Sequence, residues 1–443
     1  MMNTPAYDLL GIGIGPFNLS IAALASSKAQ LSTLFLEKQA RFAWHPGMLL
    51  SDAKMQTSYL KDLVTSVDPT NPYSFLNYLV SQQKLYPFIA SGQSVISRLE
   101  FSDYLSWAAQ ALPNTQFDHE VQSVSFEQGR FTLETKQQRL HSRHLVIGTG
   151  TRPKMPDFCQ ALVNDTCFHA SELGLRKPNL SGKRVAIIGG GQSGADIFQH
   201  VFDGEFGKVS QLTWVSRRPN IEVLDESCFT DQYFMPDYVN GFYSLQQDIK
   251  NSEVARQKFT SDGITNDCLL SIYQRLYHDR YVLRNPPWWS IQPNRSLTSL
   301  SDHNTGYQLQ LKHGLNQNTT QLDADVVILC TGYQRALPPC IAELSKLFER
   351  DTAGQIQLNA DFDVNWQGPS KNRIYMVNAG LHSHGIAEPQ LSLASWRAAK
   401  ILNHASEQSL YKIEEKHSMI DWGLSPSSLA SRHQSATLSA INA

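Results

Sequence analysis

The sequence lacks the cysteine pairs, the one-sided charge and the long apolar runs that mark several classes of protein. Its 443 residues include six scattered cysteines with no CxxC pair, so neither a disulfide framework nor a cysteine-rich metal site is indicated. These thiols fit a reducing compartment, and we expect a cytoplasmic protein. A formal net charge of -2 gives no electrostatic reason to bind nucleic acid.

No stretch approaches the ~20 apolar residues that a membrane span needs. The apolar segment from Leu9 to Ala25 is interrupted by glycines and is preceded by Asp8 with no Lys or Arg, which is not typical of a signal sequence. We expect a buried strand, a turn and a helix there. The length exceeds what one hydrophobic core usually fills, so we expect two or three lobes, with small molecules as partners.

The N-terminal region has the pattern of a β-α-β unit. Strands are predicted over 7–12 and 31–36, with a helix over 18–25 between them. The turn after the first strand contains Gly11, Gly13, Gly15 and Pro16. It departs from the usual GxGxxG because proline stands in the sixth position, where glycine normally lets helix and sheet pack closely.

This turn predicts a dinucleotide site. Small residues let backbone N–H groups approach a pyrophosphate, and the helix N-terminus adds partial positive charge. Glu37 ends the second strand about twenty residues later, where its carboxylate can accept hydrogen bonds from ribose hydroxyls. A glycine-rich turn that binds nothing is the alternative, but the strand, the helix and the acid all stand where a nucleotide needs them.

A second β-α-β unit lies in mid-chain, with strands predicted over 185–188 and 212–215. Its turn is a regular GxGxxG with Gly189, Gly191, Gln192, Ser193 and Gly194, and its second strand ends in Ser216, Arg217 and Arg218. Arginines there pair with a 2'-phosphate, so NADPH is favoured over NADH; solvated surface arginines are the alternative. Two such units predict an α/β protein with two doubly wound Rossmann-like dinucleotide-binding domains plus a small helical substrate lobe.

The order of these units predicts the domain boundaries. We expect a discontinuous FAD-binding domain over 1–155 and 325–420, an NADPH-binding domain over 156–224 and 282–324, and a helical substrate lobe over 225–281. The split is predicted because two apolar strands that each run into a Thr-Gly turn bracket the second unit. Residues 425–443 are rich in Ser and Ala and predict a flexible tail.

An aromatic and polar block follows Glu37 directly. It contains Trp44, His45, Met48, Gln56 and Lys61. A loop at this place would run beneath a flavin ring, although single residues of these types are more often part of a core. Near the C-terminus, His382 and His384 lack an accompanying carboxylate or cysteine cluster, so we expect no metal and favour a flavin-facing loop.

Together these blocks resemble a known family. The blocks GIGPFNLS, WHPGM, MQTSYLKDLV, DPTNPYSFLNYL, FHASEL, SGKRVAIIGGGQSGAD, WVSRR, CTGY and HGIAEPQLS are similar to those of the microbial N-hydroxylating monooxygenases of siderophore synthesis. The resemblance extends to about residue 420 and is strongest for lysine ε-N-hydroxylases of the aerobactin type. Ornithine hydroxylases share the framework less closely.

The resemblance implies a noncovalently bound FAD that NADPH reduces. O2 then adds to flavin carbon 4a, and the substrate amine attacks the distal oxygen of the hydroperoxide while bound NADP+ shields it from water. The amine must be neutral, so the resemblance favours a partly desolvated pocket over a strong general base. A homo-oligomer is a further expectation from the family.

The resemblance also implies roles for single residues. Trp44, His45, Met48 and Gln56 are expected against the flavin. Further cofactor contacts are expected from Thr331, Gly332, Tyr333, His384, Gly385, Leu391 and Ser392. Lys61 matches the position that holds a substrate carboxylate, which favours an amino acid over a diamine. The ornithine enzymes carry asparagines where this chain has Asp231 and Ser261, so L-lysine is favoured, with Asp231 expected to bind a substrate ammonium.

Other functions stay open as alternatives. The substrate could be L-ornithine, putrescine, cadaverine or histamine. A disulfide oxidoreductase needs a redox cysteine pair near the first flavin domain, and the first cysteine is Cys159. Other two-nucleotide flavin monooxygenases carry FxGxxxHxxx, but Val163 and Asp165 stand where Phe and Gly are needed before His169. A nucleotide-binding protein without turnover is a further alternative, against which the intact second turn argues.

Overall fold

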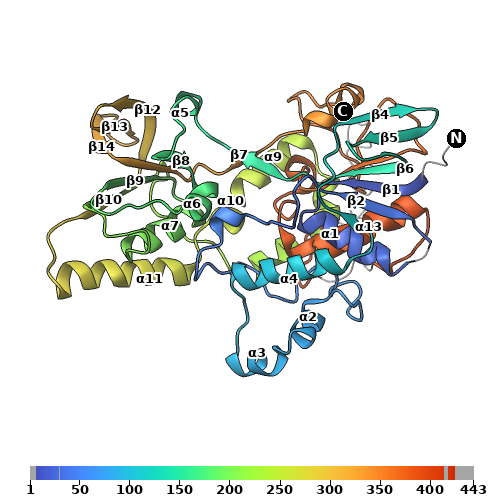
Figure 1. Ribbon diagram of the computed structural model, residues 1–443, viewed down its shortest axis with the longest axis horizontal. Helices are drawn as coiled ribbons and strands as arrows, with labels where there is room; N and C mark the ends of the chain where they lie inside the picture. Colours follow the sequence, from blue (N-terminus) through green and yellow to red (C-terminus); the bar gives the residue numbers. More distant parts are fainter. Residues whose placement is uncertain (1–5, 29, 414–417, 425–443) are drawn as a thin grey trace, which may run out of the picture.

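The computed structural model describes residues 6–28, 30–413 and 418–424. The chain forms two lobes, each built on its own sheet (Figure 1). The predicted tail over 425–443 lies outside the described residues. No helix in the described part of the chain is long and apolar enough to cross a membrane.

The first lobe contains a seven-stranded sheet in the order β3-β2-β1-β6-β5-β4, with β17 also pairing with β6. Its strands are β1 (Ala6–Ile12), β2 (Thr33–Leu36), β3 (Thr115–Gln116), β4 (Ser123–Glu127), β5 (Arg130–Glu134), β6 (Arg139–Ile147) and β17 (Ile374–Met376). The strands β2, β1, β6 and β17 are parallel, as a nucleotide-binding sheet requires. This sheet is therefore built from two distant stretches of the chain.

Helices cover one face of the first sheet. The main ones are α1 (Pro16–Ser26), α4 (Arg98–Ala111) and α13 (Ala394–Ser406), with α2 (Phe75–Ser81) and α3 (Leu85–Ser91) beyond them. α1 is apolar nearly all round and is buried between the sheet and α13, because a helix without a polar face must be covered on several sides. Leu9 faces these helices while its neighbour Leu10 faces the β4–β5 side, as the two-residue period of a strand requires.

The second lobe contains a five-stranded parallel sheet in the order β11-β10-β9-β15-β8. Its strands are β8 (Cys167–His169), β9 (Arg184–Ile188), β10 (Gln211–Val215), β11 (Trp289–Gln292) and β15 (Val326–Leu329). The helix α7 (Gln192–Phe202) covers one face. An antiparallel sheet covers the other, formed by β12 (Arg295–His303), β13 (Gly306–His313) and β14 (Thr319–Ala324). The prediction of two Rossmann-like domains is confirmed.

One boundary differs from the prediction. The strand 326–329 pairs with β9 and β8 in the second sheet, so the chain does not return to the first lobe at 325. Four buried apolar residues fit the middle of either parallel sheet, and their composition does not say which. The crossing comes later, where β16 (Tyr333–Arg335) pairs with β7 (Thr151–Pro153) between the lobes (Figure 1).

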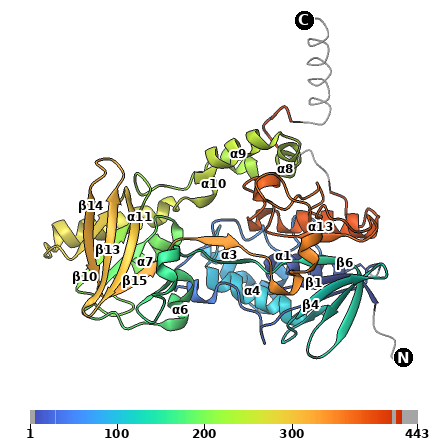
Figure 2. The same cartoon turned by 90° about the horizontal axis from the view of Figure 1, so that it is seen from above.

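The helices of 225–281 also differ from the prediction, because they do not form a separate lobe. They are α8 (Pro236–Tyr243), α9 (Gln247–Arg256), α10 (Lys258–Asp262) and α11 (Asn266–Tyr277). α8 and α9 contact α12 (Leu381–His384), while α11 packs on α7 and buries Ile272 in the second core. Figure 2 shows α8, α9 and α10 running along one side of the molecule, from α13 toward the second lobe. α8 and α11 bury apolar side chains against the elements that they contact, whereas α9 buries only Lys250 and α10 buries no residue.

Candidate functional site

The first glycine turn begins at Gly13 rather than at Gly11, which lies inside β1. Gly13 has a φ of +87°, and its N–H donates to the carbonyl of Leu36 at the end of β2, at 2.8 Å. Gly15 is the N-cap of α1 and Pro16 is its first residue. The first N–H groups of the helix have no partner within the helix, so they can bind a pyrophosphate.

Counted from Gly13, the sixth position of the turn is Asn18, so placing Pro16 there was wrong. The buried Asn18 side chain donates from Nδ2 to the carbonyls of Ile12 and Gly13, at 3.2 and 2.7 Å. Space for it depends on Gly148, where a Cβ would lie 2.5 Å from the Asn18 side chain. Spacing alone missed Asn18, because the end of β1 sets where the turn begins.

Glu37 lies against this turn, as predicted for a ribose-binding acid. One carboxylate oxygen accepts the N–H of Ile14 and the other accepts the N–H of Gln39, both at 3.0 Å. Two backbone donors hold the carboxylate in a fixed orientation, and its other lone pairs can accept hydrogen bonds from ribose hydroxyls.

The second turn has the regular glycine spacing. Gly189 has a φ of +140°, Gly191 is the N-cap of α7, and a Cβ on Gly194 would lie 2.2 Å from the Gly189 carbonyl oxygen. Gln192 and Ser193 are the first two residues of α7. This arrangement brings a helix N-terminus close to the end of β9, which suits a second pyrophosphate.

Arg218 and Arg217 follow β10 and differ in their surroundings. Arg217 is exposed. The Arg218 guanidinium lies 5.3 Å from the Phe259 ring, and its Nη2 donates to the Asp262 carbonyl at 2.9 Å. Burial lowers the pKa of Arg218, and its buried Nη1 has no partner among the described residues. A half-buried guanidinium with a free donor atom fits a phosphate. The buried Ser216 fixes the turn by accepting the Arg218 N–H at 3.1 Å.

Lys61 and Asp231 are brought together although they lie far apart in the sequence. Lys61 Nζ is 3.5 Å from Asp231 Oδ2, and the two side chains are 28% and 56% exposed. Ser261 is not joined to them, because its hydroxyl bonds two residues of its own helix, the Lys258 carbonyl and the Asp262 carboxylate. Two of the three predicted substrate residues therefore meet.

Asp62, which the sequence did not single out, organises the loop that carries Lys61. Its buried carboxylate accepts the N–H groups of Val64, Thr65 and Phe75 at 2.6 to 2.9 Å. Burial raises the pKa of Asp62, while these donors act in the opposite direction. The acidic residue next to Lys61 was visible in the sequence, but its backbone partners were not.

The aromatic block is divided between the two lobes. Trp44 packs edge-on against His45, and the His45 ring contacts Tyr333, with ring centroids 5.3 and 5.6 Å apart. Met48 instead lies buried in the core of the second lobe. Gln56 is exposed, and its Nε2 lies 3.5 Å from Gln192 Oε1. A contact between Met48 and a flavin stays a prediction.

The C-terminal block over 384–392 contains three buried side-chain polar atoms without hydrogen-bond partners among the described residues, His384 Nε2, Glu388 Oε2 and Ser392 Oγ. The His384 ring stacks on Phe362 with centroids 4.2 Å apart, and burial lowers the pKa of His384 well below its usual value. Gly385 follows with a φ of +78°, and Leu391 and Ser392 precede α13. Free buried donors and acceptors beside the helices of the first lobe fit a polar ring system such as a flavin.

The CTGY block lies at the crossing between the lobes. Thr331 Oγ1 donates to the Lys154 carbonyl, and the Gly332 carbonyl accepts from His169 Nε2 at 3.1 Å. His382 bonds the Ile356 carbonyl through Nε2. Among the described residues, no group of His, Cys, Asp and Glu side chains is arranged to hold a metal ion.

Comparison with known proteins agrees with this geometry. A family model, L-lysine 6-monooxygenase/L-ornithine 5-monooxygenase, matches residues 5–335. The L-lysine N6-monooxygenase of Escherichia coli is 46% identical over 419 residues, which are 94% of this chain and 98% of that protein.

Two solved structures are similar along most of the chain. The FAD-bound cadaverine monooxygenase of the desferrioxamine pathway from Erwinia amylovora has a TM-score of 0.89 and 28% identity, covering 94% of this chain and 98% of that one. The ornithine N-hydroxylase of Kutzneria sp. 744, with reduced FAD, NADP+ and L-ornithine, has a TM-score of 0.83 and 28% identity, covering 91% and 99%. The family match over well over half of the chain and the 46% identical relative show that this chain belongs to the L-lysine 6-monooxygenase/L-ornithine 5-monooxygenase family of flavin monooxygenases.

Proposed function

We propose that this protein hydroxylates the terminal amine of L-lysine, using FAD, NADPH and O2, in the synthesis of a hydroxamate siderophore. The observation that carries the proposal is the pairing of Lys61 with Asp231 at 3.5 Å. A free amino acid presents a carboxylate and an α-ammonium on the same carbon. Lys61 can bind the carboxylate and Asp231 can bind the α-ammonium. The two side chains can therefore give up their contact with each other and bind the substrate instead.

This pairing favours an amino acid over a diamine, because a diamine has no carboxylate for Lys61. Asp231 favours lysine over ornithine only through the resemblance, in which ornithine enzymes carry asparagine. The 46% identical relative is a lysine enzyme, while the two solved structures are a cadaverine and an ornithine enzyme. Hydroxylation of ornithine, or of a diamine or histamine, is the second candidate.

The cofactor sites support the same proposal. FAD would be held by the turn at Gly13, by Glu37 and by the block around Ser392, and NADPH by the turn at Gly189 and by Arg218. When bound, these cofactors supply the electrons that split O2, so that NADPH, H+, O2 and the amine give NADP+, water and the hydroxylamine. The residues of the chain bind and orient the reactants and exclude water from the flavin.

The substrate amine must lose its charge before it reacts. The amine of lysine has an ordinary pKa of about 10.4. We propose that Lys61 and Asp231 hold the other end of the molecule, and that the reacting end then meets less hydrated surroundings, where the ammonium is disfavoured. We also propose a cytoplasmic location, which agrees with six free cysteines. A homo-oligomer stays a prediction.

The test is product formation by the FAD-loaded protein with NADPH and, separately, L-lysine, L-ornithine, cadaverine, putrescine and histamine. We expect hydroxylated lysine to dominate. Lys61→Met should raise the KM for lysine by about 10- to 100-fold, since a charge-assisted hydrogen bond is lost, and should leave any diamine turnover unchanged. The exposed Lys346, remote in sequence and paired with Glu343, gives the control Lys346→Met. Turnover of a diamine alone would overturn the lysine proposal.

A further inference from the structure

The segment 46–53 follows the first β-α-β unit but is anchored in the second lobe. Met48, Leu50 and Ala53 are at most 5% exposed and belong to the core that surrounds α7 and β9. At Gly47 the two backbones touch, since a Cβ there would lie 1.9 Å from the Ser171 carbonyl oxygen. The same segment continues directly from Trp44 and His45, the predicted flavin neighbours.

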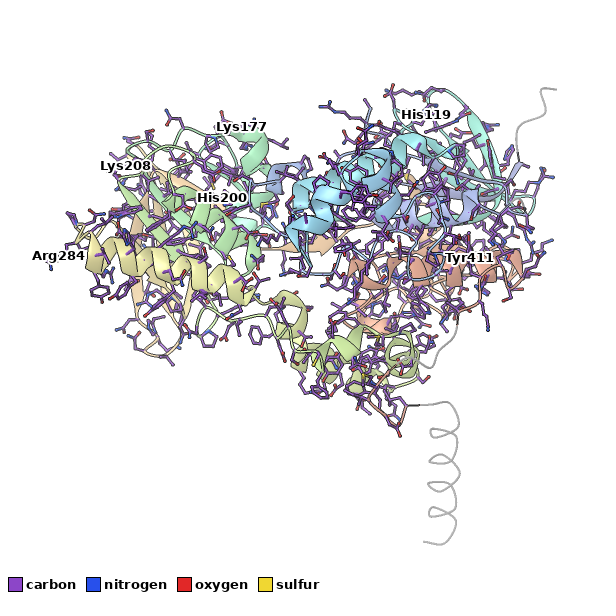
Figure 3. The ribbon with its side chains drawn as sticks, turned by 90° about the horizontal axis from the view of Figure 1, so that it is seen from below. His119, Lys177, His200, Lys208, Arg284 and Tyr411 are labelled. Atoms are coloured by element: carbon purple, nitrogen blue, oxygen red, sulfur yellow. The ribbon has the colours of Figure 1, made fainter. Side chains whose placement is uncertain are left out.

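Polar contacts fix this segment to the C-terminal end of α7. Asp52 Oδ1 lies 2.8 Å from His200 Nε2, and Asp52 Oδ2 accepts from Gln199 Nε2 at 3.1 Å. His200 is 2% exposed and lies in the second lobe (Figure 3). Its Nδ1 donates to the Asp196 carbonyl at 2.7 Å, which fixes the ring with Nε2 toward Asp52. The carboxylate is therefore held by two neighbouring residues of one helix.

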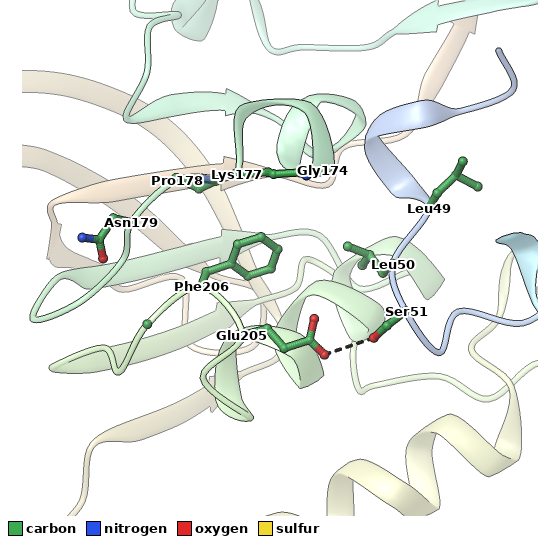
Figure 4. Close-up of a pocket in the computed structure, with 10 residues that line it drawn as sticks. Leu49, Leu50, Ser51, Gly174, Lys177, Pro178, Asn179, Glu205 and Phe206 are labelled. Carbon is green, nitrogen blue, oxygen red and sulfur yellow. Dashed lines mark hydrogen bonds between the residues drawn. The ribbon is translucent and has the colours of Figure 1, made fainter.

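A hydroxyl contact lies beside this pair. Ser51 Oγ donates to Glu205 Oε1 at 3.2 Å (Figure 4). These two residues also line a pocket of about 460 Å³ between the segment, the helix α6 (Leu173–Arg176) with the residues that follow it, and the loop at 205–207. The contact between Ser51 and Glu205 therefore adds to the apolar packing of Leu50 at this edge of the segment.

Beyond the segment 46–53, Gln56 reaches the N-terminal end of the same helix. Gln56 lies 3.5 Å from Gln192, whose Oε1 also accepts the Thr265 N–H at 2.9 Å and whose Nε2 donates to Asp196 at 2.7 Å. The longer stretch 46–56, which includes the segment 46–53, thus runs along α7. It contacts the helix at Gln192 and again at Gln199 and His200. α7 carries the second glycine turn at its start.

We propose that Asp52, Gln199 and His200 form a lobe lock, a polar contact that fixes the position of the second nucleotide turn relative to the predicted flavin neighbours Trp44 and His45. They are positioning residues, because they touch neither nucleotide turn and act through the segment 46–56 and α7. Hydride transfer from a nicotinamide to a flavin requires the two rings in contact, and a displacement of about 1 Å is enough to cost a large factor in rate. A loosened lock shifts the second lobe relative to the flavin and lets water reach it.

The inference rests on the proposed function, since its consequence is the coupling of NADPH oxidation to hydroxylation. In uncoupled turnover NADPH, H+ and O2 give NADP+ and H2O2, and the amine is left unchanged. The lock therefore predicts that its loss raises the peroxide formed per NADPH, while the FAD content stays that of the wild type.

The test compares Asp52→Asn with Asp203→Asn in the FAD-loaded full chain. Asp203 directly follows α7. Unlike Asp52, it pairs within the second lobe, with Arg275 on α11 at 2.9 Å. Amide hydrogen exchange of residues 46–53 and the ratio of peroxide to hydroxylamine are measured. Asp52→Asn should raise both by about fivefold and Asp203→Asn neither, because Asn can still accept from Gln199 and only the charge is lost at a half-exposed position. Equal behaviour of the two variants would overturn the lock.

A second variant replaces the Gln199 amide, which donates to Asp52, with a carboxylate. Gln199→Glu places a second carboxylate against Asp52, and the repulsion should uncouple turnover more than Asp52→Asn does. The double change Asp52→Asn with Gln199→Glu leaves one carboxylate at this contact, and coupling should recover. Absence of uncoupling in Gln199→Glu would contradict the proposal. If the wild type hydroxylates no amine at all, the proposed function fails, while the exchange of 46–53 still tests the lock.

Discussion

In both lobes the first strand of the β-α-β unit runs into a glycine with positive φ, Gly13 at +87° and Gly189 at +140°. Each glycine N–H donates at 2.8 Å to the last carbonyl of the next strand, that of Leu36 or Val215. In each case a Cβ would strike a carbonyl that follows a neighbouring parallel strand. The two turns are therefore built on the same backbone frame.

The lobes differ in what bonds the carbonyl of that glycine. In the second lobe, Gly194 leaves room beside the Gly189 carbonyl, which accepts from Trp214 Nε1 at 2.7 Å. In the first lobe, Asn18 occupies the place of Gly194 and donates to the Gly13 carbonyl at 2.7 Å. The third glycine of the motif is dispensable where a helix side chain supplies the donor.

The lobes also differ in the charged residue that lies near the end of the second strand. The first lobe has the acid Glu37, fixed by two backbone N–H groups, and the second has Arg218, with a free buried donor. An acid suits ribose hydroxyls and repels a 2'-phosphate, whereas an arginine binds it. The same frame thus carries an acid as the first residue after β2 and an arginine as the third residue after β10.

The largest effect should come from the glycine frame. In Gly13→Ala the new Cβ would lie 2.6 Å from the Gly148 carbonyl oxygen at a positive φ, so the protein should purify with little FAD. Gly189→Ala, with a Cβ 2.0 Å from the Cys330 carbonyl oxygen, should keep FAD and lose NADPH binding. Flavin absorbance and anaerobic reduction by NADPH measure the two outcomes. Full flavin content in Gly13→Ala would contradict the conclusion that both turns depend on a glycine at this position.

Next in size is the choice of NADPH. Arg218→Ala should raise the KM for NADPH by about 10- to 100-fold, because charge-assisted hydrogen bonds to the phosphate are lost. The KM for NADH should not change. The exposed Arg217 gives the matched control Arg217→Ala, with an expected change of about threefold or less. Steady-state kinetics with both nucleotides measure these values, and equal effects of the two arginines would refute the role of Arg218.

Loss of the side chain that donates to the glycine carbonyl should have an intermediate effect on stability. Asn18→Gly restores a regular GxGxxG, yet we expect it to lower the free energy of unfolding by about 1–3 kcal/mol, because the Gly13 carbonyl loses its donor. In the first lobe, Phe35 occupies the position that corresponds to Trp214. Its side chain has no N–H group, so it cannot replace Asn18 as the donor. Trp214→Phe should destabilise the second lobe similarly. Amide exchange resolves the lobes, and a stabilised Asn18→Gly would contradict this account.

The smallest effect concerns an ion pair of the second sheet. Arg184 donates to both Asp325 oxygens, at 2.7 to 3.2 Å, and lowers the pKa of that carboxyl. A lowered pKa stabilises the fold above the ordinary carboxyl range near ~3.9, and the benefit is lost as the pH falls through the lowered value. Asp325→Asn should therefore cost about 1 kcal/mol at neutral pH, since the pair is partly exposed, and nothing in strong acid. Denaturant unfolding at both pH values checks this; a constant difference would contradict it.

Much of the architecture was predictable because apolar periodicity and glycine turns are local. Both β-α-β units and the residues Glu37 and Arg218 stand where the pattern predicted them. The register of the first turn was not predictable, since β1 extends through Ile12 and places Gly11 inside a strand. The sheet that holds 326–329 was equally undetermined, because a short apolar strand fits either parallel sheet.

By itself, the sequence determined the family and the two nucleotide units, because glycine turns, strand ends and charged residues act over a few neighbouring positions. Only the tertiary structure decided which distant residues meet. The pairing of Lys61 with Asp231 and of Asp52 with His200 depends on how two lobes pack. Such contacts follow from the burial of whole faces, Met48 and Leu50 among them, and no local pattern in the chain encodes that arrangement.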